Sequence, residues 1–158
     1  MRRLVKFVHT LASSGLIGAF LGYALILAYA TPDDTRAYAD ARQTISLICS
    51  ILLLPSLGLA LITGLLSMVV HRAFLDTRWA WLKALLGMSM FEATFAIVQS
   101  KATTAAAEAA KVLAGEGDAE LLSTSLSNEW MSLAALLALS AAQVALGVWR
   151  PRLEFRQT

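Results

Sequence analysis

Four ionisable side chains lie within or at the ends of long apolar segments, and their chemistry could support a function: His9, His71, Lys83 and Glu92. The imidazole of His9 can ligate haem or a metal ion, exchange a proton, or simply hydrogen-bond a carbonyl group. His71 is expected at a helix C-terminus, where a cation interacts favourably with the helix dipole. Lys83 lies about one turn inside an apolar segment, so its ammonium group can reach the membrane interface.

An apolar run at residues 78–99, RWAWLKALLGMSMFEATFAIVQ, carries the carboxyl group of Glu92 near its middle. Glu92 lies 13 residues after Trp79, which is roughly 20 Å along a helix axis and too far for a short side chain to reach water. A charged acid at the centre of a span costs about 2.5–3.5 kcal/mol on insertion scales. We therefore expect Glu92 to be neutral and to face the bundle interior, hydrogen-bonded to Gln143 or Ser56. Proton handling, ligand binding and metal coordination are the alternatives.

The sequence lacks the short motifs of soluble catalysis, such as a nucleotide-binding glycine loop, H-E-x-x-H or G-x-S-x-G. Cys49 is the single cysteine, which excludes an intrachain disulfide and a metal cage built from several cysteines. The sequence therefore assigns no catalytic residue, and it leaves enzymatic activity open.

Composition indicates that helices in a membrane must position these side chains. The chain is 58% hydrophobic and 15% charged, with a mean hydropathy of +0.65, whereas soluble domains carry about 25% charged residues. About 20 apolar residues cross a bilayer, and helices satisfy their own backbone groups in lipid. We predict an all-α, polytopic membrane protein, a single domain whose four transmembrane helices form an antiparallel bundle. The predicted spans are residues 4–30, 45–70, 79–98 and 130–149.

The basic residues predict the orientation of the bundle. Nine of them flank the two termini and the link between the second and third spans, and four lie on the other side. Because cytoplasmic loops are enriched in Lys and Arg, we expect both termini in the cytoplasm. The nine are Arg2, Arg3, Lys6, Arg72, Arg78, Lys83, Arg150, Arg152 and Arg156, and the four are Arg36, Arg42, Lys101 and Lys111.

The segments expected on the outer side have helical signals of their own. Thr31-Pro32-Asp33-Asp34 is typical of a helix start, with Thr31 as the N-cap, which predicts an outer helical extension over residues 32–44. The alanine-rich stretch after Gln99 predicts a second extension over residues 100–113. The acidic segment GEGDAELLSTSLSNE, residues 115–129, is expected to be a solvated loop, with a cation-binding patch as the alternative.

Small and polar residues predict which helix faces pack inside the bundle. Ser14, Gly18 and Gly22 form a small-residue stripe that would let a neighbouring helix approach closely. Pro55 should kink the second helix, because its ring removes one backbone hydrogen bond. A polar stripe on that helix should face inward, and it comprises Cys49, Ser56, Thr63, Ser67 and His71.

Three short patterns occur in order along the chain: Leu4-x-Lys6-x-x-His9 followed by glycines, Pro55 with Gly64 nine residues later, and Trp79-x-x-x-Lys83. Over residues 3–98 this order resembles the CopD-like bacterial membrane proteins and the related HemJ-type protoporphyrinogen oxidases. The resemblance implies a four-helix core that binds haem b or a metal, with His9 and Lys83 as cofactor-binding residues. It also implies that the protein lies in the inner membrane of a bacterium. HemJ-type proteins have a histidine near the position of Glu92, so the looser CopD-like and uncharacterised relatives are the better match.

Three functions remain in view from the sequence. The first is a redox-related membrane protein with haem or a metal bound inside the bundle and His9 as a ligand. The second is a proton-coupled transport protein in which Glu92 titrates, and the third is an accessory or scaffolding subunit of a larger membrane complex. The expected partners are the lipid bilayer and other membrane helices, in a homo-oligomer or a larger complex, and not nucleic acid.

Overall fold

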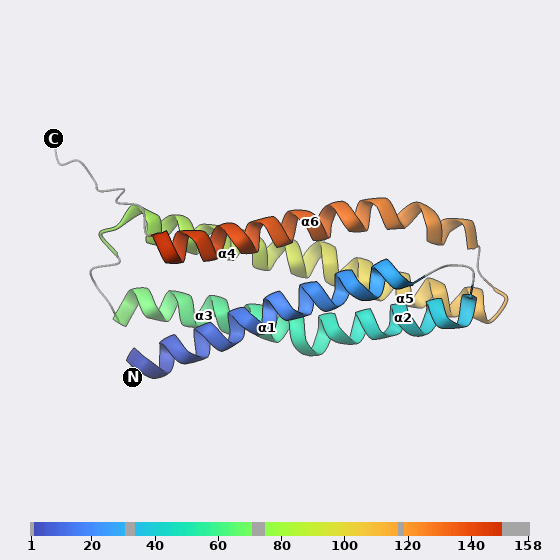
Figure 1. Cartoon of the computed structure of the whole chain (residues 1–158), viewed down its shortest axis with the longest axis horizontal. Helices are drawn as coiled ribbons and strands as arrows, with labels where there is room; N and C mark the ends of the chain where they lie inside the picture. The colour runs from blue at the N-terminus through green and yellow to red at the C-terminus, as the bar shows by residue number, and fades with distance from the viewer. Residues whose placement is uncertain (1, 31–33, 71–74, 117–118, 150–158) are drawn as a thin grey trace.

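The computed structural model describes residues 2–30, 34–70, 75–116 and 119–149, without the side chains of residues 2, 97 and 119–128. Four long helical rods make up these residues (Figure 1). The first rod is α1 (Arg2–Tyr29), and the last is α6 (Ala119–Trp149). The second rod joins α2 (Thr35–Leu47), the π-helical segment η1 (Ile48–Leu53) and α3 (Leu54–Val70). The third joins α4 (Arg78–Ala93), the π-helical segment η3 (Thr94–Gln99) and α5 (Ser100–Leu113).

All four rods are long and apolar enough to cross a membrane, which confirms the predicted all-α architecture with four spans. The rods alternate in direction, so the start of α1, the end of α6 and the link from α3 to α4 lie at one end of the bundle (Figure 1). We call this the terminal end, and we call the end where α2 and α5 lie side by side the extension end. The distribution of basic residues predicts that the terminal end faces the cytoplasm, and this orientation stays a prediction.

The second rod accommodates Pro55 with a local change of helix type. Proline cannot donate a backbone hydrogen bond, so a regular α-helix would leave one carbonyl group without its donor. The six residues of η1 lie just before the proline, and the backbone N–H of Leu54 bonds to the carbonyl oxygen of Cys49, five residues earlier. The predicted disturbance at Pro55 therefore takes the form of a π-helical segment, in which the backbone stays hydrogen-bonded.

The interior is built mainly from one face of α1 and the inward stripe of the second rod. On α1 the aromatic rings of Phe20 and Tyr23 are fully buried. On the second rod the predicted polar stripe does face inward, because Cys49, Ser56 and Thr63 are buried. Ser67 is half-buried, and His71 lies outside the described residues.

The predicted small-residue stripe on α1 is wrong at Ser14 and Gly18, whereas its third member, Gly22, is half-buried and a Cβ atom there would lie 4.0 Å from Ile48 Cδ1. Ser14 and Gly18 are exposed, and a Cβ atom added at Gly18 would meet nothing within 4 Å. The close approach occurs instead at Gly15, where a Cβ atom would lie 2.8 Å from the Ser56 hydroxyl oxygen. The inward face of α1 therefore runs through Gly15 and Gly22 and not through Gly18.

Beyond the core, α2 packs along α5 at the extension end (Figure 1). Tyr38 and Ala39 of α2 and Ala109 of α5 form a second small hydrophobic cluster. The N-cap of α2 is Asp34, whose side chain accepts hydrogen bonds from the backbone N–H groups of Arg36 and Ala37. The predicted cap Thr31 lies outside the described residues.

The acidic segment before the fourth span is not a loop over its whole length. The backbone of α6 is already helical at Ala119, ten residues before Glu129, so most of the segment predicted to be a solvated loop belongs to the helix. Glu129 itself is buried, with 3% of its surface exposed. The expectation of a loop was wrong because it rested on the acidic residues of this stretch, whereas the backbone from Ala119 onward is helical and belongs to α6.

Candidate functional site

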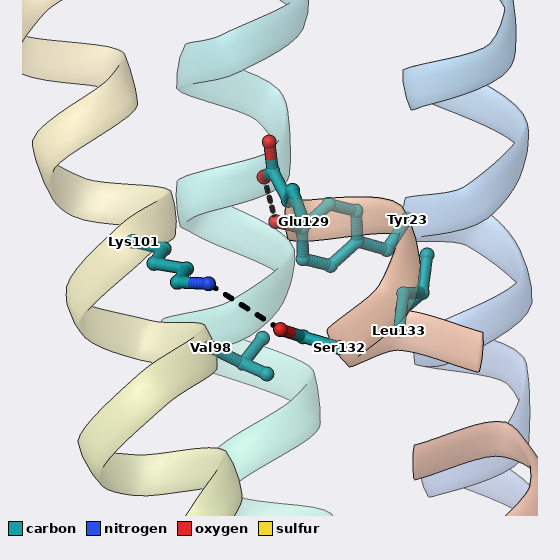
Figure 2. A pocket seen from close by; sticks show the side chains of 6 residues that line it. All are labelled: Tyr23, Val98, Lys101, Glu129, Ser132 and Leu133. Carbon is teal, nitrogen blue, oxygen red and sulfur yellow. Dashed lines mark hydrogen bonds between the residues drawn. The ribbon is translucent and has the colours of Figure 1, made fainter. Parts of the chain in front are cut away.

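A cluster of two charged side chains and two tyrosines is buried among the described residues of the bundle. Arg42 comes from α2 and Glu129 from α6, and their side chains are 1% and 4% exposed. The Nη1 atom of Arg42 donates to both carboxylate oxygens, at 2.9 and 2.7 Å. Tyr23 of α1 donates its hydroxyl hydrogen to the same carboxylate (Figure 2). Three of the four rods therefore meet at Glu129.

Tyr38 completes the cluster from the turn of α2 that precedes Arg42. Because residues four apart share one face of a helix, the guanidinium group lies over the tyrosine ring, 5.0 Å from its centroid. The Nε and Nη2 atoms of Arg42 donate to the Tyr38 hydroxyl oxygen, at 2.9 and 2.7 Å. The guanidinium group is thus hydrogen-bonded on two sides, which is what a buried charge requires.

The described side chains beside Tyr23 and Glu129 pack closely around the carboxylate. The space beside Tyr23 and Glu129 has a volume of about 0 Å³, because the side chains of Val98, Lys101 and Leu133 close it (Figure 2). Lys101 reaches across to Ser132, with 3.3 Å between Nζ and Oγ. The cluster therefore links α1, α2 and α6 to one another.

The ligand-sized space lies toward the terminal end of the bundle. A partly open cavity of about 550 Å³ lies between α1, α3, α4 and α6, and its volume is within the range of small-molecule and cofactor sites. Most of its lining is apolar, and no acid is among the described residues that line it. Its charged and polar lining residues are Arg3, Lys6, His9, Ser13, Ser67, Lys83, Ser140 and Gln143.

His9 is held in this cavity by backbone and side-chain groups of α3. Its Nδ1 atom lies 2.9 Å from the carbonyl oxygen of Ala60 and 3.1 Å from the hydroxyl oxygen of Thr63. A carbonyl oxygen only accepts, so Nδ1 carries the hydrogen and the neutral ring keeps a lone pair on Nε2. Gly64 lets the ring pack against α3, because a Cβ atom there would lie 3.4 Å from the His9 Cε1 atom.

Lys83 enters the same cavity from α4. The Gln143 side chain of α6 donates to the backbone carbonyl oxygen of Lys83, at 3.0 Å, which ties the two helices together at this level. Gly147 leaves room for the ammonium group, since a Cβ atom there would be 2.7 Å from Nζ. The structure therefore brings together the two residues that the sequence pattern nominated for cofactor binding.

Glu92 does not face the bundle interior, so that expectation is wrong. Its side chain is exposed on the outer surface of α4 and does not line the cavity. The two suggested partners are engaged elsewhere, Gln143 with Lys83 and Ser56 against Gly15. The inward side of this part of α4 is taken by Met90 and Thr94, which are buried. A proton path through the bundle by way of Glu92 therefore has no support in this arrangement.

The sequence did not single out the Arg42–Glu129 pair, because it counted Arg42 among the outer basic residues and Glu129 within a loop. One signal was available: both charges lie next to the expected start of a span at the same end of an antiparallel bundle. Among the described residues no three His, Cys, Asp or Glu side chains gather into a metal-binding group. His71 lies outside the described residues.

Comparison with known proteins places the chain in a membrane family. No curated protein and no solved structure gives a significant match to it. One family model matches residues 3–151, nearly the whole length, and carries the description "Predicted integral membrane protein (DUF2269)". This match supports the predicted membrane class. It does not test the CopD-like resemblance, which stays an expectation. The chain therefore belongs to the DUF2269 family of integral membrane proteins.

Proposed function

We propose that this integral membrane protein binds haem b in the cavity between α1, α3, α4 and α6, with His9 as an axial ligand, and has a redox-related role. One observation carries the proposal: His9 lines a ligand-sized cavity with its Nδ1 hydrogen bonded to the Ala60 carbonyl oxygen. Histidines that bind metals commonly donate one ring N–H in this way, which fixes the tautomer and makes the other nitrogen more basic.

The remaining lining suits a flat apolar molecule that ends in carboxylates. Leu16, Leu57 and Leu61 are among the apolar side chains around the cavity. Arg3, Lys6 and Lys83 supply positive charge, and no described lining residue offsets it with a negative one. Haem b combines an apolar ring with two propionates, so both parts of this lining are complementary to it.

Each residue has a separate task in this proposal. His9 binds the iron through Nε2, Ala60 and Thr63 fix the direction of the imidazole ring, and Lys83 binds a propionate. Haem supplies one-electron transfer, whose potential depends on the axial ligand and on the polarity of the pocket. The protein's own contribution is to position the group and to keep water from most of its surface.

An absorption spectrum tests the proposal directly. The protein is expressed with a haem precursor supplied, purified in mild detergent and examined for a Soret band, with metal analysis on the same sample. We expect the native protein to show the band and His9→Ala to lose or shift it. Thr10→Ala is the matched control, because Thr10 is exposed on the adjacent position of α1 and should leave the band unchanged. A native protein that stays colourless when haem is supplied contradicts the proposal.

The location that we propose is the bacterial inner membrane, with both termini in the cytoplasm. The support is the excess of basic residues in the sequence around the two termini and around the link between α3 and α4. In that orientation α2 and α5 extend on the outer side, and the proposed haem cavity lies in the cytoplasmic half of the bundle.

A second candidate is an accessory role within a larger membrane assembly. The observation that favours it is Glu92, a carboxyl group exposed on a face of α4 that would otherwise contact lipid. Such a group is costly in hydrocarbon unless another helix covers it. Co-purification of a second protein in a fixed ratio with the native chain, lost in Glu92→Leu, would support this role.

A further inference from the structure

Two methionines line the proposed haem cavity together with His9, and they come from different helices. Met68 belongs to α3 and Met90 to α4, and both side chains are buried. Haem iron in proteins is held by His, Met, Cys or Tyr side chains. Among the described residues that line the cavity, those of these four types are His9, Met68 and Met90. A second protein ligand to the iron would therefore be a thioether sulfur.

The two methionines differ in their position relative to the imidazole ring of His9. At the terminal end α1 and α3 lie on one side of the bundle, and α4 and α6 lie on the other (Figure 1). His9 comes from α1, and its ring is hydrogen-bonded to Ala60 and Thr63 of α3. Met68 belongs to this same pair of helices, whereas Met90 belongs to the opposite pair. Because axial ligands bind opposite faces of the haem ring, Met90 is on the side from which a second ligand has to come.

Gly87 shows how the depth of Met90 in the bundle compares with that of His9. A Cβ atom on Gly87 of α4 would lie 3.5 Å from the Leu61 Cδ1 atom of α3. Leu61 belongs to the turn of α3 that holds the His9 ring, so Gly87 is level with that turn. Met90 follows Gly87 by three residues, on the same helix face and roughly 4.5 Å further along the axis. Long side chains on a helix lean toward its N-terminus, which for Met90 is the direction of Gly87 and of the cavity.

The Met90 sulfur keeps its lone pairs available for a metal. The Ser140 hydroxyl oxygen of α6 lies 3.9 Å from this sulfur, but it also lies 2.8 Å from the Leu136 carbonyl oxygen, to which it donates. A hydroxyl group has one hydrogen, so the sulfur receives no strong hydrogen bond from Ser140. Met90 is 2% exposed, which shields its sulfur from water. A thioether carries no proton, so its ability to bind iron requires no particular protonation state.

We propose that Met90 is the second axial ligand of the haem, opposite His9. This inference rests on the proposed function, and it gives the iron one nitrogen ligand and one sulfur ligand from the protein. A His and Met pair raises the reduction potential of haem. It also leaves no open position on the iron for oxygen or another small molecule. The redox-related role would therefore be electron transfer, without binding of a substrate to the iron.

Absorption and electron paramagnetic resonance spectra of the full chain loaded with haem test this ligand pair. A ferric haem with His and Met ligands is low-spin and has a weak sulfur-to-iron charge-transfer band in the far red, and we expect both features in the native protein. Met90→Leu should keep a Soret band, lose the charge-transfer band and become high-spin, with a lower midpoint potential. Leucine fills nearly the volume of methionine, so the bundle should stay folded, which circular dichroism checks.

Two other methionines provide matched controls with the same substitution. Met88 lies two residues before Met90 on α4 and is 53% exposed, so Met88→Leu should leave the spectrum and the midpoint potential unchanged. Met68 lines the cavity from α3. Met68→Leu should keep the low-spin state and the charge-transfer band, because the proposed sulfur ligand stays in place.

The outcomes separate this inference from the proposed function. A native protein that shows no Soret band when haem is supplied refutes both. A native protein that has a Soret band but is high-spin refutes Met90 as a ligand, and haem binding stands. A low-spin spectrum that is unchanged in Met90→Leu, or a charge-transfer band that is lost in Met68→Leu instead, has the same meaning.

Discussion

Arg42 and Glu129 form an ion pair across 87 positions of sequence, with 2.7 Å between Nη1 and Oε2. The pair joins α2 to α6, and the Tyr23 hydroxyl group adds α1 to the same carboxylate. Both charged side chains are almost completely removed from the surface. Burial makes each of them costly without the other, so the two side chains have to be considered as one unit.

Removal of one charge should destabilise the bundle strongly. Arg42→Met leaves the Glu129 carboxylate buried without its cation, which typically costs about 3–5 kcal/mol. The double variant Arg42→Met, Glu129→Leu should recover most of that loss, because no charge is left buried. Reversible unfolding in detergent measures both values. The exposed pair Lys111–Glu108, at 2.8 Å, is the control, since Lys111→Met should change stability by less than about 1 kcal/mol. A similar loss of stability in the single and the double variant would show that the two charges do not act as one unit.

Two glycines on α1 should respond in opposite ways to the same substitution. A Cβ atom at Gly15 would lie 2.8 Å from the Ser56 hydroxyl oxygen, whereas one at Gly18 would meet nothing within 4 Å. Gly15→Ala should therefore lower the unfolding temperature, at a cost of about 1–3 kcal/mol for overpacking. Gly18→Ala should be neutral or slightly stabilising, because alanine is the better helix former.

The source of the Gly15 effect can be checked with a second substitution. Ser56→Ala removes the hydroxyl oxygen, and the nearest remaining Ser56 atom, Cβ, lies 3.6 Å from the added methyl group. Gly15→Ala should therefore lower the unfolding temperature less when it is added to a chain that already carries Ser56→Ala than when it is added to the native chain. Equal effects of Gly15→Ala and Gly18→Ala would show that the contact between α1 and α3 is looser than described.

Substitution of Lys83 should weaken the affinity for haem and leave the position of the Soret band unchanged. Lys83→Met removes a cation from the cavity and leaves His9 in place, so the Soret band of the complex should keep its position. Loss of a charge-assisted hydrogen bond of about 1.5–3 kcal/mol corresponds to roughly a 10- to 100-fold weaker affinity. Titration of the haem-free protein with hemin measures this, with Lys111→Met as a control at a distant exposed cation. Unchanged affinity in Lys83→Met would exclude the assigned propionate contact.

Thiol labelling should determine the orientation of the bundle. A cysteine introduced at Gly117, in the link between α5 and α6, should react with an impermeant thiol reagent added to intact cells. A cysteine at Thr158, after α6, should react only once the membrane is permeabilised. Cys49 is buried, so the native chain supplies the unlabelled control. The reverse pattern would place both termini outside.

The sequence by itself determined the class and the spans, because the length and composition of an apolar segment are local properties. It also nominated His9, since an ionisable side chain in an apolar segment is visible without a fold, and the family resemblance added Lys83. Their meeting in one cavity was decided by the packing of α1, α3, α4 and α6, which also created the volume around them. The residues of α6 that help to form it, Ser140, Gln143 and Gly147, carried no such signal.

Only the tertiary structure decided which face of each helix is covered. Gly15 and Gly18 are three residues apart on one helix, and composition does not tell which of them meets Ser56. Glu92 was expected inside because charge is costly in lipid, but Met90 and Thr94 take the inward side of α4 and turn the carboxyl group outward. Arg42 and Glu129 meet because α6 begins at Ala119 and runs past α2, a register that depends on how two distant helices pack. These relationships are set by contacts between segments, and a single stretch of sequence holds only one side of each contact.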